Sequence, residues 1–311
     1  MPHWMLPSEA ASPMSYTGEF AALGTAVCWA SASNLFAAAA GSMGPRILNR
    51  LRLTVAWGLL TISLWVVHHA WWPTWASWPA VVALALSGMT GFIFGDSFAF
   101  RAIVILGPGR ASLLASTAPL FTTALAWPIL HQRPGPLALL GMLLTLSGTA
   151  LVFTASSRRR PGQSEGRMAR GIVSGLLGAI GQAGGYVLSK LALRSGLDPL
   201  SATVIRVGCA CIAFWILTAF ARQVGPTLAA LRDPGAVAFM AGGALMGPVL
   251  GVLLMLTSLA LIEAGVAASI VAVSPLIAML MAARFHNERL TWRTLAGSLV
   301  AIAGIVVLFR R

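Results

Sequence analysis

The stretch GFIFGDSFAFRAIVILGPGRASLLASTAP at residues 91–119 aligns with GPVLGVLLMLTSLALIEAGVAASIVAVSP at residues 247–275, with many side chains changed but several Gly and Pro residues at the same positions. The offset of 156 positions holds without a gap over residues 91–153 and 247–309. It pairs Gly91 with Gly247, Gly95 with Gly251, Gly109 with Gly265, Pro119 with Pro275, Gly141 with Gly297 and Gly148 with Gly304. Fixed spacing of Gly and Pro predicts two copies of one structural unit.

Composition indicates a chain that resides in a membrane. Of the 311 residues, 58% are hydrophobic and only 9% are charged, whereas an ordinary soluble domain carries about a quarter charged residues. The apolar residues gather in blocks of about twenty, the length at which a helix crosses a hydrocarbon core of about 30 Å. The blocks do not alternate in hydropathy as the strands of a membrane barrel do, so the spans are predicted to be helices.

The spacing of the apolar blocks predicts an all-α polytopic membrane protein of about ten transmembrane helices, arranged as two inverted five-helix repeats. The expected organisation is a tail at residues 1–17, a first repeat at 18–155, a basic linker at 156–170 and a second repeat at 171–309. The expected spans lie near residues 18–39, 50–70, 79–101, 109–129, 135–154, 171–191, 200–221, 235–257, 265–285 and 292–309.

The number of spans in each copy determines how the copies are oriented. Five is odd, so two consecutive copies enter the membrane from opposite sides and are related by a pseudo-twofold axis in its plane. Transporters use such inverted repeats because two similar halves can exchange conformations around a fixed site at the midplane. We therefore expect a polar cavity where the two halves meet.

A family resemblance supports this interpretation. Residues 95–130, GDSFAFRAIVILGPGRASLLASTAPLFTTALAWPIL, and residues 256–290, LTSLALIEAGVAASIVAVSPLIAMLMAARFHNERL, resemble the third and fourth helices of EamA-type members of the drug/metabolite transporter superfamily. The features in common include mid-helix Pro119 and Pro275 and the first-helix Trp29. The resemblance covers nearly the whole chain and implies a transporter of small molecules.

Two features depart from what the resemblance implies. Gln132 occupies the first-half position where the family usually has the acidic residue that is Glu288 in the second half, so any contact made by that acid would be asymmetric here. Fifteen Lys and Arg residues lie near the odd-numbered connections and five near the even-numbered connections and tails. By the positive-inside rule this count predicts both termini outside, whereas the resemblance implies cytoplasmic termini.

The basic residues also bear on partners. The formal net charge is +13, but the charges lie mostly at the ends of apolar blocks, where topology and lipid headgroups account for them. No nucleic-acid partner is predicted. The expected partners are membrane lipid and a small-molecule solute, for a multi-pass monomer or homodimer in the bacterial cytoplasmic (inner) membrane.

Asp96, in the third span, is the leading candidate for the transport chemistry. A charge inside an apolar span is costly, so such residues are functional candidates by default. Its carboxylate would bind a substrate ammonium or take up a proton during the cycle. The alternative is an ion pair with Arg52 or Arg101, although Arg101 is five residues on and about 140° round the helix.

Four cations are candidates for binding an anion or for structural roles. Arg52 and Arg206 sit early in the second and seventh spans, and matching places in both halves favour a structural role such as holding a helix end. Lys190, at the end of the sixth span, is weighed between the same two roles, structural or anion-binding. Binding an anionic group of the solute is the alternative for each of these residues and for Arg101.

The first and sixth spans carry polar and aromatic side chains that the resemblance places around the central cavity. These are Trp29 and Asn34 on the first span and Gln182 and Tyr186 on the sixth. Gln182 and Tyr186 are four residues apart and share a helix face. Polar bonding between packed membrane helices is the alternative role.

Two prolines are predicted to interrupt the fourth and ninth spans. Pro119 and Pro275 each remove a backbone hydrogen bond, which frees a carbonyl and creates a kink where a gate would bend. A kink without gating is the alternative. Ser116 and Ser274, beside them, are assigned to the cavity, with close helix packing as the other role.

Several function classes lack their signatures in this sequence. There is no nucleotide-binding loop of the GxxxxGK[ST] type, no metal-ligand spacing and no catalytic cluster, so no cofactor, metal or enzyme activity is predicted. The sequence favours a secondary transporter, as an exporter of small metabolites or drugs. The alternatives are an intramembrane enzyme acting on lipid-linked substrate and a non-transporting receptor or assembly partner.

Overall fold

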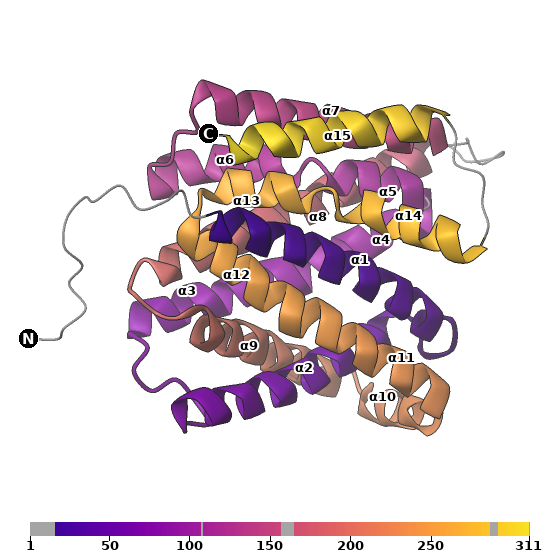
Figure 1. The fold of residues 1–311 in the computed structure, drawn as a ribbon. Helices are drawn as coiled ribbons and strands as arrows, with labels where there is room; N and C mark the ends of the chain where they lie inside the picture. The colour runs from indigo at the N-terminus through magenta and orange to yellow at the C-terminus, as the bar shows by residue number, and fades with distance from the viewer. Residues whose placement is uncertain (1–15, 107, 157–164, 287–291, 311) are drawn as a thin grey trace, which may run out of the picture.

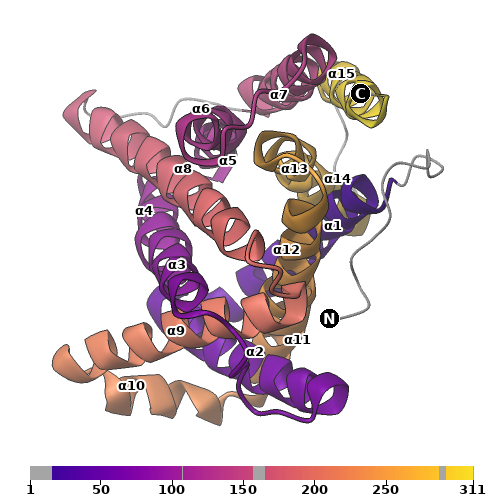
Figure 2. The same cartoon turned by 90° about the vertical axis from the view of Figure 1, so that its left-hand side faces the viewer.

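The computed structural model describes residues 16–106, 108–156, 165–286 and 292–310. Within these residues it is helical throughout, with turns between the helices and no strand (Figures 1 and 2). The first half comprises α1 (Thr17–Met43), α2 (Pro45–His68), α3 (Trp78–Gly88), the π-helix η1 (Met89–Gly95), α4 (Asp96–Leu106), α5 (Pro108–Ala115), α6 (Ala118–Leu130) and α7 (Pro136–Ser156).

The second half repeats this order, with two short elements, α10 (Val224–Ala229) and the 3-10 helix η2 (Ala230–Arg232), added between its second and third spans. Its other elements are α8 (Glu165–Leu193), α9 (Pro199–Phe220), α11 (Pro234–Ala244), the π-helix η3 (Leu245–Gly251), α12 (Val252–Leu261), α13 (Ala264–Val271), α14 (Ser274–His286) and α15 (Trp292–Phe309). α8 begins at Glu165, inside the segment expected to be a linker. The remaining expected linker residues up to 164, apart from 156, and Glu288 lie outside the described residues.

Eight helical segments are long and apolar enough to cross a membrane. They correspond to the first four expected spans of each half. The fifth expected span of each half coincides with α7 and α15, whose apolar portions are the shorter Pro136–Leu151 and Ala296–Phe309. The described residues therefore support a multi-pass membrane protein, and the count of ten spans stays a prediction.

The internal repeat is visible in the backbone. η1 spans Met89–Gly95 and η3 spans Leu245–Gly251, so the two π-helical segments are related by the same offset of 156 that aligns the sequences. A π-helix is rare and is found frequently at functional sites. Two irregular segments at equivalent positions therefore indicate a shared design for the third span of each half.

The fourth span of each half is broken, again at equivalent positions. The helix is interrupted at residues 116–117 between α5 and α6, and at 272–273 between α13 and α14. Pro119 and Pro275 are each the second residue of the helix that resumes. Proline cannot donate the backbone hydrogen bond that a continuous helix would need at this point, which accounts for the break.

The first helix of each half packs against the third span of the other half. α8 lies along α3, η1 and α4, and α1 lies along α11, η3 and α12 (Figures 1 and 2). Glycines permit both approaches: a Cβ atom on Gly95 would lie 3.3 Å from the backbone nitrogen of Gln182, and one on Gly251 would lie 2.5 Å from Nε1 of Trp29. Small residues let membrane helices approach closely.

α7 and α15 form a close pair at one side of the bundle (Figure 1). A Cβ atom on Gly148 would lie 2.6 Å from the carbonyl oxygen of Gly297, and one on Gly304 would lie 2.8 Å from that of Gly141. The offset of 156 converts one contact into the other, because Gly148 is equivalent to Gly304 and Gly141 to Gly297. The two helices run antiparallel. This is the contact pattern that a pseudo-twofold axis between the two helices produces.

Candidate functional site

The leading candidate site is a cavity of about 220 Å³ between the two halves. Segments from both repeats form its wall: α1, the junction of η1 with α4, the broken helix α5–α6, α8, and the broken helix α13–α14. The lining residues are Trp29, Gly95, Asp96, Ala99, Ala111, Ala115, Ser116, Ala118, Pro119, Gly175, Gly178, Ala179, Gln182, Tyr186, Ala268, Val271, Ala272, Ser274 and Pro275.

Both helix breaks contribute to this wall. Pro119 and Pro275 line the cavity, as do Ser116 and Ser274. The Ser274 hydroxyl donates to the carbonyl of Val271 at 2.6 Å, which is the acceptor that Pro275 leaves without its helical donor. Irregular backbone at membrane depth is tolerated where it lines a cavity, so the position of the two breaks is physically consistent with a hollow between them.

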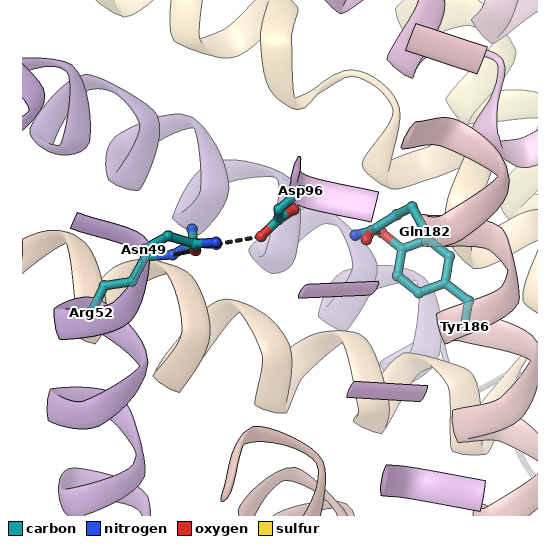
Figure 3. A network of polar contacts seen from close by, with 5 residues as sticks. All are labelled: Asn49, Arg52, Asp96, Gln182 and Tyr186. Carbon is teal, nitrogen blue, oxygen red and sulfur yellow. Dashed lines mark hydrogen bonds and ion pairs between the residues drawn. The ribbon is translucent and has the colours of Figure 1, made fainter. Parts of the chain in front are cut away.

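α8 and α1 supply the polar and aromatic part of the wall. Nε2 of Gln182 donates to the hydroxyl of Tyr186 at 3.0 Å (Figure 3). The rings of Trp29 and Tyr186 are stacked, with centroids 6.4 Å apart and planes at 18°. Nearer the start of α8, Gly175 and Gly178 also line the cavity, and they let α5 and α4 pack closely, since a Cβ atom would lie 2.4 Å from Leu114 and 3.0 Å from Ala99 respectively. This surface offers amide and hydroxyl groups next to an aromatic face.

Asp96 forms an ion pair with Arg52, one of the two partners weighed from the sequence (Figure 3). The side chain of Asp96 is 25% exposed and that of Arg52 is 13% exposed. Nε of Arg52 also donates to the side chain of Asn49 at 2.6 Å, and its guanidinium lies 5.2 Å from the ring centre of Phe36. Arg52 is thus held on several sides, and the Asp96 carboxylate it binds lines the cavity.

Arg206 is the most deeply buried cation of the described bundle. It is 2% exposed, and its guanidinium lies 5.0 Å from the ring centre of Phe92. Within the described residues its Nε has no hydrogen-bond partner, and no carboxylate forms an ion pair with it. Nη2 lies against two glycines: a Cβ atom on Gly91 would be 2.9 Å from it, and one on Gly185 would be 3.2 Å from it.

A set of contacts that the sequence did not predict joins the end of α8 to neighbouring helix ends. Lys190, one turn beyond Tyr186, donates to the carbonyls of Leu259 and Ile262, the latter at 2.7 Å. Arg194 donates to the carbonyl of Leu130. We call Lys190, Arg194 and their carbonyl acceptors the α8 clasp; sequence showed the cations but could not show which carbonyls they reach.

Gln132 lies near this clasp. Its Oε1 accepts a hydrogen bond from the backbone nitrogen of Ala264 at 3.1 Å, the first residue of α13. A side-chain acceptor at this place satisfies one of the free N–H groups at the start of a helix. The amide therefore ties the end of the fourth span to the start of the ninth.

Asn34 and Arg101, like Arg52, Arg206 and Lys190, lie outside the cavity lining. The Asn34 side chain donates to the carbonyls of Ala30 at 3.2 Å and Ala278 at 3.4 Å, which joins α1 to α14. Arg101 is exposed on α4. The other cavity candidates, Trp29, Asp96, Ser116, Gln182, Tyr186 and Ser274, all lie along it, and their role toward a solute stays a prediction. No group of three or more potential metal ligands occurs in the described part of the chain.

Comparison with known proteins adds a family to this geometry. The model of a family described as the EamA-like transporter family matches residues 16–154 and 169–310. A protein of Streptantibioticus cattleyicolor, named a probable terminal-alkyne amino-acid exporter, is 45% identical over 47 residues, which is 15% of this chain and 16% of that protein. A solved chain titled only as a crystal structure of a protein matches with a TM-score of 0.67 and 18% identity, over 93% of this chain and 95% of that one; at this identity the likeness shows the fold alone.

Proposed function

This chain belongs to the EamA-like transporter family, and from that membership we propose that it is a secondary transporter that exports small organic metabolites or drugs. The proposed mechanism is alternating access: two inverted repeats open a midplane cavity first to one side of the membrane and then to the other. Family membership favours transport over an intramembrane enzyme, the other function weighed from the sequence.

The observation that carries this proposal is the composition of the cavity wall. Equivalent broken helices, α5–α6 and α13–α14, both face the hollow, and so do the equivalent first helices of the two halves, α1 and α8. When corresponding parts of two repeats line a cavity, each repeat can adopt the other's conformation while the same residues continue to line the cavity. We propose that Pro119 and Pro275 act as the hinges of this exchange.

The α8 clasp is proposed to hold one end of the cavity closed in the present state. Lys190 lies one turn beyond Tyr186, which lines the cavity, and it binds the end of α12 before the turn to α13. Opening at this end requires α8 to separate from the ends of α6 and α12, so the clasp contacts would break in the opposite state.

Energy coupling is proposed to use the Asp96–Arg52 ion pair. A proton on Asp96 would remove its negative charge and weaken the hold of Arg52, whereas loss of that proton would restore the pair. A solute ammonium would compete for the same carboxylate, so proton and solute would bind in turn rather than together. That alternation is what proton-coupled exchange requires.

Export is proposed as the direction because the matched stretch of the Streptantibioticus cattleyicolor protein belongs to a probable exporter. The match is too short to transfer its solute. We place the chain as a monomer or homodimer in the cytoplasmic membrane of a bacterium.

The test begins with a growth screen of cells with and without the protein, exposed to amino acids, nucleosides and cationic drugs. A solute to which the protein confers resistance is then loaded into liposomes that contain the purified full chain, and efflux is measured at two pH values. Asp96→Asn is expected to slow efflux and to abolish its pH dependence, while Asp233→Asn, at the N-cap of α11 outside the spans, serves as the control. If no solute leaves these liposomes faster than it leaves solute-loaded liposomes without protein, transport is refuted. If Asp96→Asn leaves the efflux rate and its pH dependence unchanged, the coupling role of Asp96 is refuted.

A further inference from the structure

Arg52 and Arg206 occupy equivalent places in the two halves. α2 begins at Pro45 and α9 begins at Pro199, and in each helix the arginine is the same number of residues beyond that proline. Each guanidinium also lies over a phenylalanine ring, Arg52 over Phe36 and Arg206 over Phe92. The repeat therefore supplies one cation from each half to the region around the cavity.

Only one of these cations forms a direct ion pair within the described residues, although Asp96 also lies within electrostatic range of Arg206. Arg52 is paired with Asp96. The offset that relates the two third spans places Val252, the first residue of α12, at the position equivalent to Asp96. The second half thus keeps the arginine and replaces the acid with an apolar side chain.

An arginine in this setting is expensive to maintain. Arg206 is more deeply buried than Arg52, and its Nε lacks a hydrogen-bond partner among the described residues. The effective cost of burying an ion is several kcal/mol unless a counter-charge and hydrogen bonds offset it. Charged residues inside membrane spans almost always face the bundle interior or a water-filled cavity, and they mark substrate or ion pathways.

Arg206 does not line the cavity itself but lies next to Gln182, which does. The same point beside Gly91 that is 2.9 Å from Nη2 of Arg206 is 3.6 Å from Oε1 of Gln182, and Gln182 lines the cavity. Arg206 also lies within electrostatic range of Tyr186 and Asp96, which both line the cavity. Figure 3 shows Asp96 and the Gln182–Tyr186 pair as separate polar groups of the site.

We propose that the end of the cavity lined by Gln182 and Tyr186 binds a carboxylate of the solute, with Arg206 supplying the opposite charge. The inference rests on the proposed transport function and specifies its substrate class. A cavity of about 220 Å³ has the liquid volume of about seven waters, so it accommodates a small amino acid or a short carboxylic acid. An amino group on the solute would be directed to Asp96.

Three probes of similar size separate the parts of this proposal: pentanoate carries a carboxylate alone, norvaline carries a carboxylate and an ammonium, and norvalinamide carries an ammonium alone. Thermal unfolding of the purified full chain is measured against the concentration of each, because a ligand that binds the folded state raises the midpoint. Pentanoate and norvaline are expected to stabilise the chain, norvaline more strongly, and norvalinamide is expected to do so least.

Variants then locate the carboxylate. Arg206→Gln is expected to weaken binding of both acids at least about tenfold, since a hydrogen-bonded charge pair commonly contributes that much. Gly91→Asp places an internal carboxylate beside Nη2 and should weaken acid binding more than Gly91→Asn, which fills the same space without charge. Arg222→Gln, on an exposed turn, is the charge-matched control. The Gly91 pair keeps the test decisive if Arg206→Gln fails to fold.

The proposal is overturned if neither acid stabilises the wild-type chain, if norvalinamide does so as well as norvaline, or if Gly91→Asp and Gly91→Asn bind the acids equally. Failure of the proposed function gives a different result. Acid binding without efflux of any solute would keep the carboxylate site and refute transport, whereas efflux of neutral or cationic solutes without acid binding would keep transport and refute this site.

Discussion

The Ser274 hydroxyl donates to the backbone carbonyl of Val271 at 2.6 Å, directly at the break in the ninth expected span. Pro275 cannot donate to that carbonyl, so Ser274 replaces the missing hydrogen bond. The equivalent position in the first half is Ala118, and there the Thr117 hydroxyl donates to the carbonyl of Leu114 at 2.6 Å. The two breaks are thus equivalent in place but stabilised by different side chains.

Ser274→Ala is predicted to destabilise the ninth expected span. The variant leaves the Val271 carbonyl without the serine donor, at a cost of about 1 kcal/mol. Ser147→Ala is the matched control, since that serine makes a similar bond to Leu144 on an exposed face of α7. Chemical denaturation in detergent measures both. Equal losses for the two variants would show that the break does not depend on this hydroxyl.

Arg52→Gln is predicted to cost more stability than Arg52→Gln combined with Asp96→Asn. The single variant leaves the Asp96 carboxylate without its partner, whereas the double variant removes both charges, and breaking a buried pair commonly costs about 3–5 kcal/mol. The partial exposure of Asp96, 25%, places the expected cost below that range. A double-mutant cycle on unfolding free energies gives the coupling. A coupling energy of zero would mean that the ion pair contributes nothing to stability.

Gly148→Ala is predicted to weaken the pairing of α7 with α15. The added methyl group would meet backbone atoms of Ala301 and Gly297, and such overpacking typically costs about 1–3 kcal/mol. Gly184→Ala is the control, because a Cβ atom there meets nothing within 4 Å. Midpoints of thermal unfolding should fall for the first variant and hold for the second; the reverse order would contradict the close pair.

Lys190→Met is predicted to loosen the α8 clasp. Its loss leaves the carbonyls of Leu259 and Ile262 without this donor, and hydrogen bonds to a charged group contribute about 1.5–3 kcal/mol. Arg170→Met, at the exposed opposite end of α8, controls for the loss of a cation. Hydrogen exchange of the α12–α13 turn should increase in the first variant alone. Unchanged protection there would exclude the clasp as a closure.

Much of the fold could be predicted because each membrane span is a continuous apolar block and the repeat follows from the fixed spacing of Gly and Pro. The offset of 156 read from Gly91 and Gly247 is the same offset that relates η1 to η3. The π-helical geometry itself could not be predicted, because no side-chain period distinguishes a single π segment from an α-helix. The helix breaks were predictable from Pro119 and Pro275, because proline removes a specific bond.

The candidate site was predictable in its residue types and less so in its partners. Asp96 was identified by its cost in lipid, but only the fold selects Arg52 over Arg101 as its partner. Asn34 illustrates the limit: this half-buried amide donates to carbonyls on α1 and α14 and does not line the cavity. Which backbone carbonyl a side chain reaches depends on helices far apart in the sequence.

The most direct test of alternating access uses a single thiol in the cavity. Cys28, Cys209 and Cys211 are replaced by Ala, and Ser116→Cys introduces a thiol at a buried residue of the cavity wall. Sealed vesicles of each orientation are treated with a membrane-impermeant maleimide. Alternating access predicts labelling from both sides of the membrane, with a transported solute slowing both reactions. Labelling from one side only, whatever the pH or solute, would contradict the account.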